Sequence, residues 1–194
     1  NINYYHADIL TLGQLSSTFD IIECAGVLHH MDQPIDGWRV LVNQLRPYGL
    51  MQIGLYSEVG RQAVRNARAI LAERRFSDSV SDMLQFRRFL KESDDALLKT
   101  LCRTTDFYSL SMFRDLLFHV QEHRFTLGEI KEAISSLGLR FAGFEFREHK
   151  LVLSRFRSLY PSTDSLYDLD KWALFEERNP SLFSSMYQFW VTKI

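Results

Sequence analysis

The chain has little of what marks several large classes of protein. Its 194 residues include only two cysteines, four prolines and nine glycines. Cys24 and Cys102 lack the spacing of a metal-ligand set and lie in apolar contexts, which favours a reducing compartment over a disulfide framework. No apolar run approaches the roughly 20 residues that a membrane span needs. The sequence therefore predicts a cytoplasmic protein with no membrane partner.

An excess of charge of either sign is also absent. The 23 lysines and arginines nearly balance the 24 aspartates and glutamates, which leaves a formal net charge of -1. This balance gives no general footprint for nucleic acid, so we expect no such partner. No secretion signal opens the chain, which begins at Asn1 without an initiator methionine. We therefore expect an upstream part of the same polypeptide to precede it.

The first 57 residues have the patterning of an α/β unit. Residues 2–10 form an aromatic and β-branched run typical of a strand whose tip carries Asp8. Residues 19–27 are almost continuously apolar, as in a strand covered on both faces. A helix is predicted over 34–46, followed by a strand over 48–57. The order strand, helix, strand predicts a right-handed parallel crossover.

The next part of the chain has long helical periodicity and almost no proline or glycine. Helices are expected over 61–75, 82–102 and 109–123. Thr126 then begins a further helix as its N-cap, with Glu129 at capping-box spacing. The remaining expected elements are a strand over 139–146, helices over 150–160 and 166–180, and a last strand over 186–194.

Four motifs together resemble the second half of a class I S-adenosylmethionine-dependent methyltransferase. They are "HADIL", "AGVLHH", "RVLVNQLRPYG" and "GLRFAGFEF". The resemblance implies an α/β fold with a partial Rossmann-like sheet that lacks its first strands, and a helical insertion between the fifth and sixth strands. Residues 1–57 would form the C-terminal half of the cofactor-binding core, 58–124 the helical lid, and 125–194 the remainder with the last two strands.

A narrower resemblance concerns the segments "GLYSEVGRQAVRNAR", "DFYSLSMFRDLLFHVQEHRFTLGEI" and "MYQFWVTKI". They look like the methyltransferase domain that follows tetratricopeptide repeats in bacterial proteins. This resemblance implies that the upstream part of the polypeptide holds helical repeats, and that the insertion covers the pocket of the methyl acceptor.

The resemblance also assigns the residues that would hold S-adenosylmethionine. Asp8 would bond the adenine amino group and Ile9 would pack on the ring. The methionine moiety of the cofactor would lie beside Cys24, Ala25 and Gly26. Independently, ligands of open α/β sheets lie beyond the carboxyl ends of the strands, and Gly26 has no side chain to keep a ligand away.

His29 and His30 directly follow this strand and would stand at the mouth of the site, where the resemblance places methyl transfer. Imidazoles there can bind a substrate or take a proton near neutral pH, so we expect His30, with His29 beside it, to be catalytic. The alternative is that the pair merely caps the strand or is solvated.

The segment "HVQEH" is formally an inverted zinc-protease motif, with His119, Glu122 and His123 on one helical face. A zinc site would need a further carboxylate, for which Glu176 and Glu177 are the helical candidates. We expect no metal, and we favour a role for His119, Glu122 and His123 in lining the acceptor pocket opposite the histidine pair. Metal hydrolysis and simple packing remain the alternatives.

Tyr56 ends the second strand and Arg61 follows it closely. Arg61, Arg65 and Arg68 share one helical face, which is commonly explained by solvation or by pairing with Asp or Glu. Alternatively, Tyr56 and Arg61 bind the acceptor, with Arg61 holding an acidic group in a bidentate contact.

The function expected from the resemblance is methyl transfer to an oxygen or nitrogen of a small molecule or a protein side chain. A Gly-x-Gly signature after a strand is absent, so the chain holds half a cofactor site and is expected to be inactive alone. The strand expected over 19–27 has one open edge, through which the chain could form a homo-oligomer. The alternative function is a non-catalytic interaction module with a methyltransferase-like fold.

Overall fold

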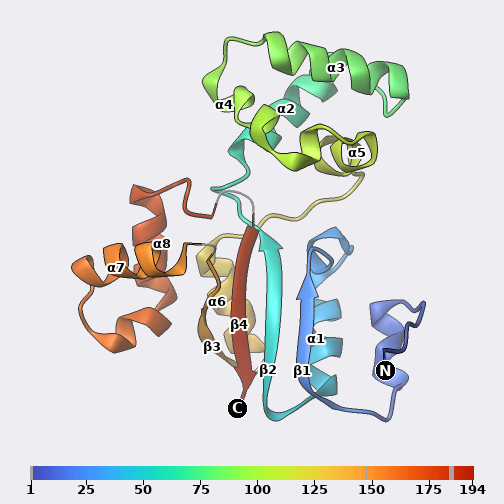
Figure 1. The fold of residues 1–194 in the computed structure, drawn as a ribbon. Coiled ribbons are helices and arrows are strands. Elements are labelled where there is room, and N and C mark those ends of the chain that lie inside the picture. Colours follow the sequence, from blue (N-terminus) through green and yellow to red (C-terminus); the bar gives the residue numbers. More distant parts are fainter. Residues whose placement is uncertain (1, 147, 184–185) are drawn as a thin grey trace.

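The computed structural model describes every residue except 1, 147 and 184–185. Its described residues form a four-stranded sheet in the order β1-β2-β4-β3 (Figure 1). The strands are β1 (Phe19–Ala25), β2 (Leu45–Tyr56), β3 (Leu139–Phe144) and β4 (Met186–Lys193). β1 runs parallel to β2, whereas β4 is antiparallel to both of its neighbours. The chain is thus the mixed α/β structure that the sequence predicts.

Helix α1 (Pro34–Gln44) connects the two parallel strands as predicted. Pro34 occupies the first turn, where its missing N–H costs no hydrogen bond. The helix buries Trp38 and Leu41 against the sheet. Lys193, at the end of β4, donates to the carbonyl oxygens of Val42 and Leu45 at 2.8 Å each, which satisfies two carbonyl groups where α1 ends.

The predicted strand over residues 2–10 is wrong. Residues 2–8 have no regular structure, and a 3-10 helix, η1 (Ile9–Gln14), follows and packs on α1. The Asp8 side chain caps η1 by accepting from the Leu10 N–H at 2.9 Å. Among the described residues β1 pairs with β2 alone, so the aromatic run has no strand to pair with and stays exposed.

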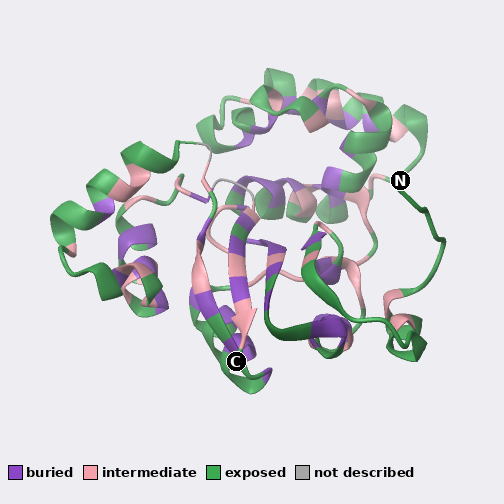
Figure 2. Ribbon diagram, turned by 60° about the horizontal axis from the view of Figure 1, so that its bottom comes forward, coloured by how far each residue is buried: buried purple, intermediate pink, exposed green. Residues whose placement is uncertain are grey.

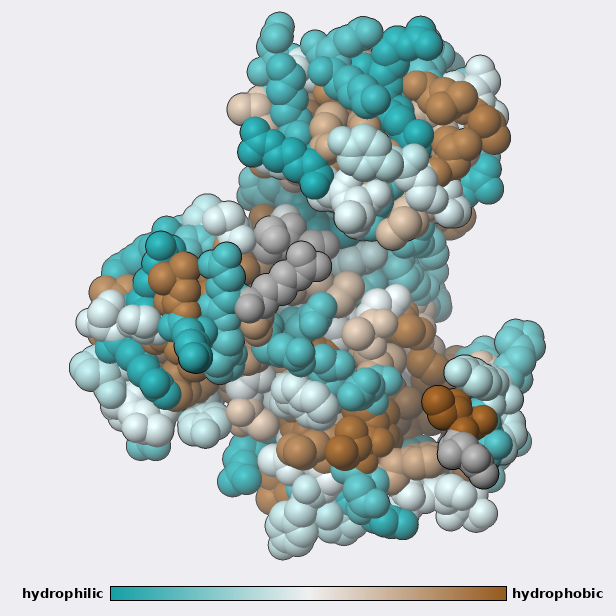
Figure 3. Space-filling model, viewed as in Figure 1, coloured by the Kyte–Doolittle hydropathy of each residue, from teal (hydrophilic) through white to brown (hydrophobic). Residues whose placement is uncertain are grey.

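The expectation that both faces of β1 are covered is also wrong. Cys24 is the buried residue of this strand, whereas 59% of Ile21 remains exposed. Helices α1 and α6 (Leu127–Ser136) both lie behind the sheet in Figure 1, and no described helix covers β1 and β2 from the front. The space-filling view shows an apolar patch on this open face (Figure 3), where exposed Ile21 is paired with exposed Leu50.

The insertion between β2 and β3 is helical, as expected, but its helices are shorter. They are α2 (Gln62–Glu73), α3 (Val80–Glu92), α4 (Ala96–Lys99) and α5 (Leu110–Phe118), with the 3-10 turns η3 (Leu101–Arg103) and η4 (Thr105–Phe107). The single helix predicted over 82–102 breaks at Glu92, because the Asp95 carboxylate accepts from two N–H groups and starts α4. The helix predicted over 109–123 ends at Phe118.

The buried apolar side chains form two clusters. One joins the sheet with α1, α6 and the C-terminal helices α7 (His149–Leu159) and α8 (Leu169–Arg178). The other lies wholly within residues 63–118, which we call the helical lobe (Figure 2). In Figure 1 the lobe lies beyond the carboxyl ends of β1 and β2. The division of the chain after residues 57 and 124 stays a prediction.

The return from the lobe to the sheet follows the sequence closely. Thr126 caps α6 in a complete capping box with Glu129, as predicted. Gly138 follows the helix with φ 66, a left-handed conformation that favours glycine.

In the described part of the chain, no helix has the length and apolar character required to cross a membrane.

Candidate functional site

The carboxyl ends of β1 and β2 meet at two glycines. The chain leaves β1 at Gly26, which has φ 77 and donates its N–H to the Gly54 carbonyl oxygen at 3.3 Å. A Cβ on Gly54 would lie 2.8 Å from the Ala25 Cβ, so glycine is needed for the two strands to approach this closely. The space around Gly26 is open, since among the described residues a Cβ there would meet only Met186, at 4.0 Å.

Two of the three residues expected beside the cofactor face this open region. Ala25 is exposed and Gly26 is half-buried. Cys24, in contrast, belongs to the apolar core, where burial raises the pKa of its thiol to about 11. The side chain of Cys24 therefore packs the sheet and does not face a ligand.

Asp8 and Ile9 lie apart from a strand tip. Asp8 is exposed at the start of η1, and Ile9 packs against the sheet core. The larger cavities described are not lined by Asp8, Ala25 or Gly26. Asp8 and the pair Ala25 and Gly26 therefore do not lie at the tips of two neighbouring strands, as the expected nucleoside-sized hollow required.

His29 is buried in the short 3-10 helix η2 (Leu28–His30), and no part of it is exposed. Its ring stacks on Tyr56 with the ring centroids 3.6 Å apart. Neither ring nitrogen has a hydrogen-bond partner among the described residues. Burial, followed by the nearby His30 and Arg61, lowers the pKa of His29 to about 3. His29 is thus a neutral packing group and does not stand at the mouth of the site.

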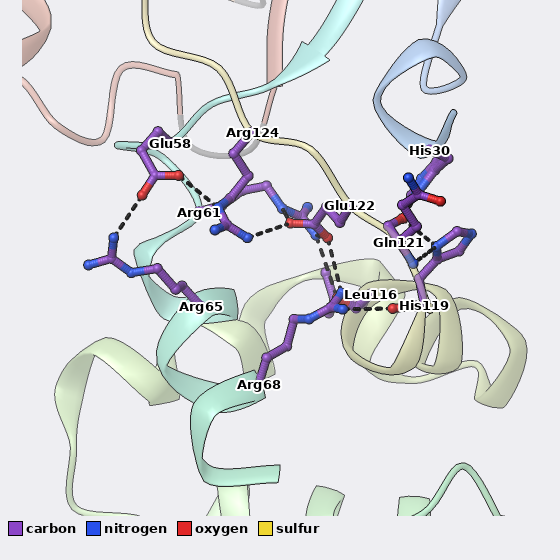
Figure 4. Close-up of polar contacts among 10 residues, drawn as sticks. All are labelled: His30, Glu58, Arg61, Arg65, Arg68, Leu116, His119, Gln121, Glu122 and Arg124. Atoms are coloured by element: carbon purple, nitrogen blue, oxygen red, sulfur yellow. Dashed lines mark hydrogen bonds and ion pairs between the residues drawn. The ribbon is translucent and has the colours of Figure 1, made fainter. Parts of the chain in front are cut away.

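His30 lies further out and is half-buried. Its Nδ1 is 3.0 Å from the carbonyl oxygen of Gln121, and its ring centroid is 4.0 Å from that of His119. His119 brings its own Nδ1 to 2.6 Å from the same carbonyl oxygen (Figure 4). The two histidines therefore meet at the junction between η2 and the lobe, whereas the sequence interpretation placed them on opposite sides of an acceptor pocket.

Arg61 and Glu122 form a buried ion pair at this junction. Arg61 donates from Nε and Nη2 to the two carboxylate oxygens of Glu122, at 3.0 and 2.7 Å. The two side chains are only 2% and 1% exposed. The Arg61 guanidinium also lies 3.5 Å from the Tyr56 ring centroid. Because His29 is equally close to that centroid, His29 and Arg61 must occupy opposite faces of Tyr56.

Further arginines surround the same carboxylate. Arg68 and Arg124 lie 3.4 and 3.7 Å from Glu122, and Glu58 pairs with Arg65 and Arg124 at 2.7 Å each (Figure 4). The common explanation of the arginine spacing, pairing with Asp or Glu, is therefore correct. With the fork of Arg61 held by Glu122, neither side chain is available to bind an acidic acceptor.

The zinc-protease interpretation of "HVQEH" is wrong. Residues 119–123 are not helical, so His119, Glu122 and His123 do not share a helical face. The His123 N–H donates to the His29 carbonyl oxygen at 2.8 Å, which ties the segment to η2. Glu176, a proposed third ligand, accepts hydrogen bonds from Tyr187 and Ser57 instead.

The hydrogen-bonded group of Glu176, Tyr187 and Ser57 is a second buried polar cluster, and the sequence interpretation did not predict it. Glu176 is 3% exposed on the buried face of α8, and its carboxylate accepts from the Tyr187 hydroxyl at 2.8 and 2.9 Å. Burial raises the pKa of Glu176, although the hydrogen bonds from Tyr187 and Ser57 oppose the change. A glutamate at a core position of an amphipathic helix was the available signal.

The structure thus brings together, from three distant segments, His30 and all five residues expected to bind the acceptor. His30, Tyr56, Arg61, His119, Glu122 and His123 meet at one junction. Asp115 and Gln121 also belong to it, although no sequence pattern singled them out. The largest cavity described, of about 640 Å³, lies elsewhere, between β4 and the helices α7 and α8.

Comparisons with known proteins agree with a mixed α/β fold. No family model matches the chain. The uncharacterized protein syc1184_c of Synechococcus sp. is 29% identical over 179 residues, which cover 88% of this chain and 43% of the relative. PKMT2 from Rickettsia typhi, solved also in complex with AdoHcy, is 16% identical with a TM-score of 0.65, over 95% of this chain and 37% of that one. The chain therefore spans about two fifths of the length of both proteins and has the fold of an S-adenosylmethionine-dependent methyltransferase.

Proposed function

We propose that the chain is the C-terminal half of the catalytic domain of an S-adenosylmethionine-dependent methyltransferase. The observation that carries the proposal is the open tip of β1 at Gly26, beside the histidine junction, in a fold whose solved neighbour was obtained with AdoHcy. An upstream part of the polypeptide would supply the glycine loop and the ribose contact, which the described residues lack.

The residues present fit the cofactor in part. Gly26 and Ala25 leave space at the strand tip for the methionine moiety. Asp8 uses Oδ1 to cap η1, so Oδ2 remains to accept from the adenine amino group, whereas Ile9 beside it packs against the sheet core. When bound, S-adenosylmethionine supplies an electrophilic methyl group on a sulfonium centre.

The chain's own residues would orient the acceptor and receive its proton. Methyl transfer is an in-line displacement, so positioning and exclusion of water are the main tasks of the protein. The Nδ1 of His30 faces the Gln121 carbonyl oxygen, which leaves its Nε2 for an oxygen or nitrogen nucleophile. We assign His30 the contact with the acceptor, and buried His29 the support of His30 and Tyr56.

Equilibrium binding of labelled S-adenosylmethionine to the complete polypeptide encoded by the reading frame tests the proposal. Asp8→Asn keeps the cap, because asparagine is also a favourable N-cap, but places an NH₂ group where an acceptor is needed. We expect this variant to bind about 5- to 150-fold more weakly, the equivalent of roughly 1–3 kcal/mol for an unsatisfied polar group. Absence of saturable binding to the wild type would remove the proposal and favour an interaction module.

A further inference from the structure

Three metal-binding side chains converge where the helical lobe meets η2. His30, Asp115 and His119 each offer a ligand atom, and these three atoms all lie within 4.8 Å of one another. Asp115 is one turn before His119 on α5, so the helix and its end present both groups on the same side. His30 reaches them from the sheet core.

A backbone carbonyl group orients the two imidazoles, as is usual for histidines that bind metals. Both rings place Nδ1 within hydrogen-bond distance of one carbonyl oxygen, that of Gln121, at 3.0 and 2.6 Å. A carbonyl oxygen can only accept, so the Nδ1 of His30 donates to it and the Nε2 of His30 carries a lone pair. The Nδ1 of His119 lies near both this carbonyl oxygen and the Gln121 N–H, which is 3.2 Å away, so a neutral His119 keeps a lone pair on one of its two ring nitrogens. A backbone carbonyl that fixes the tautomer of a ligating histidine is a common outer contact of metal sites.

The spacing and the charge of the three groups suit a small divalent cation. Ligands of a tetrahedral zinc ion at about 2.0–2.1 Å lie roughly 3.3 Å from one another, so the groups need to close by about 1.5 Å at most. Asp115 is exposed and can move by that much through a change of rotamer. The adjacent Arg61 and Arg68 are paired with Glu122, which offsets their repulsion of a cation.

We propose that His30, Asp115 and His119 bind a single first-row divalent ion, with zinc the best match to two imidazoles and one carboxylate. Three protein ligands leave a fourth position open to water or to a ligand, as in zinc sites that bind exogenous groups. The ion would join α5 to η2 and so fix the helical lobe against the sheet core.

Titration of the metal-free chain with Co²⁺ and Zn²⁺, without S-adenosylmethionine, tests the site independently of the proposed function. We expect one equivalent of Co²⁺ to give the visible absorption of a four- or five-coordinate ion, and Zn²⁺ to displace it. Asp115→Asn, a change of an exposed side chain that keeps its size, should weaken binding at least about tenfold, and His119→Ala should weaken it as much or more.

His149→Ala is the matched control, because His149 is an exposed histidine outside the three-residue cluster and should not alter the affinity. Thermal unfolding of each metal-free variant checks that the fold is retained. The proposal is overturned if the wild type shows no saturable binding of either ion. It is equally overturned if Asp115→Asn and His119→Ala both bind with wild-type affinity, or if the loss is confined to His149→Ala.

Discussion

Glu122 is the residue whose environment departs most from its appearance in the sequence. It lies between two histidines in a polar segment, yet its carboxylate is buried and faces the guanidinium of Arg61. Removing one partner of a buried ion pair leaves the other charge without compensation. We therefore expect Glu122→Ala to lower the free energy of unfolding by about 3–5 kcal/mol, measured by urea denaturation.

Glu58→Ala serves as the comparison for this prediction. Glu58 pairs with Arg65 and Arg124, but these side chains are 27–50% exposed and solvent screens the pairs. The expected loss is about 0–1 kcal/mol. Equal losses for the two variants would contradict the view that Glu122 is the structural centre of the junction.

The buried carboxyl of Glu176 should make the free energy of unfolding depend on pH. Burial raises its pKa in the folded chain, so the folded state holds this proton more tightly than the unfolded state. Its contribution to stability is therefore full below the unfolded pKa, about 4.3, and is lost as the pH rises through the folded pKa. Glu176→Gln cannot titrate, so the variant should gain stability relative to wild type as the pH increases from about 4.3.

Urea denaturation of the wild type and of Glu176→Gln from acid to neutral pH gives the difference in their free energies of unfolding directly, because the other titrating groups are the same in both chains. A difference in unfolding free energy between wild type and Glu176→Gln that does not change with pH would show that Glu176 titrates alike in the folded and unfolded states.

At the residue scale, the sequence could predict that Arg61, Arg65 and Arg68 share a face. It could not predict their partner, because Glu122 is 61 residues from Arg61 and meets it only through the path of α5.

At the scale of elements, the capping box of α6 is the clearest local signal. Thr126 accepts from the Glu129 N–H at 3.2 Å, and the Glu129 carboxylate accepts from the Thr126 N–H at 2.7 Å. We expect Thr126→Ala to lower the free energy of unfolding by about 1 kcal/mol. Ser109→Ala is the control, since Ser109 begins α5 without a side-chain capping bond and should cost less. An equal cost would contradict the capping account.

Elements with strong local signals were predicted well, and elements that depend on partners were not. The proline of α1, the capping box of α6 and the amphipathic pattern of α8 act within a few residues, and these helices lie where expected. The strand predicted over 2–10 needed a neighbour that the described chain does not contain. The helix predicted over 109–123 stopped at Phe118, because His119 turns to contact His30 and Gln121.

At the scale of the whole molecule, the open face of the sheet is the main unfinished feature. We propose that the upstream part of the polypeptide covers this face, where Ile21 and Leu50 are exposed and Trp190 is half-buried. Trp38 and Trp172 are each 1% exposed, so Trp190 is the tryptophan of the three that a solution quencher can reach.

Acrylamide quenching of tryptophan fluorescence tests this covering. We expect a quenchable component in the 194-residue chain that disappears with Trp190→Phe, and much weaker quenching of Trp190 in the complete polypeptide. If Trp190 is quenched equally in both, the upstream part does not cover this face, and self-association through the edge of β1 becomes the better explanation.

The most direct test of a methyltransferase site at the tip of β1 is photolabelling of the complete polypeptide with S-adenosylmethionine that carries a radioactive methyl group. Such a site predicts labelling that excess AdoHcy displaces, with the modified peptides of this region mapping to residues 24–30. Labelling confined to the helical lobe at residues 63–118, or labelling that AdoHcy does not displace, would contradict a cofactor site at this strand tip.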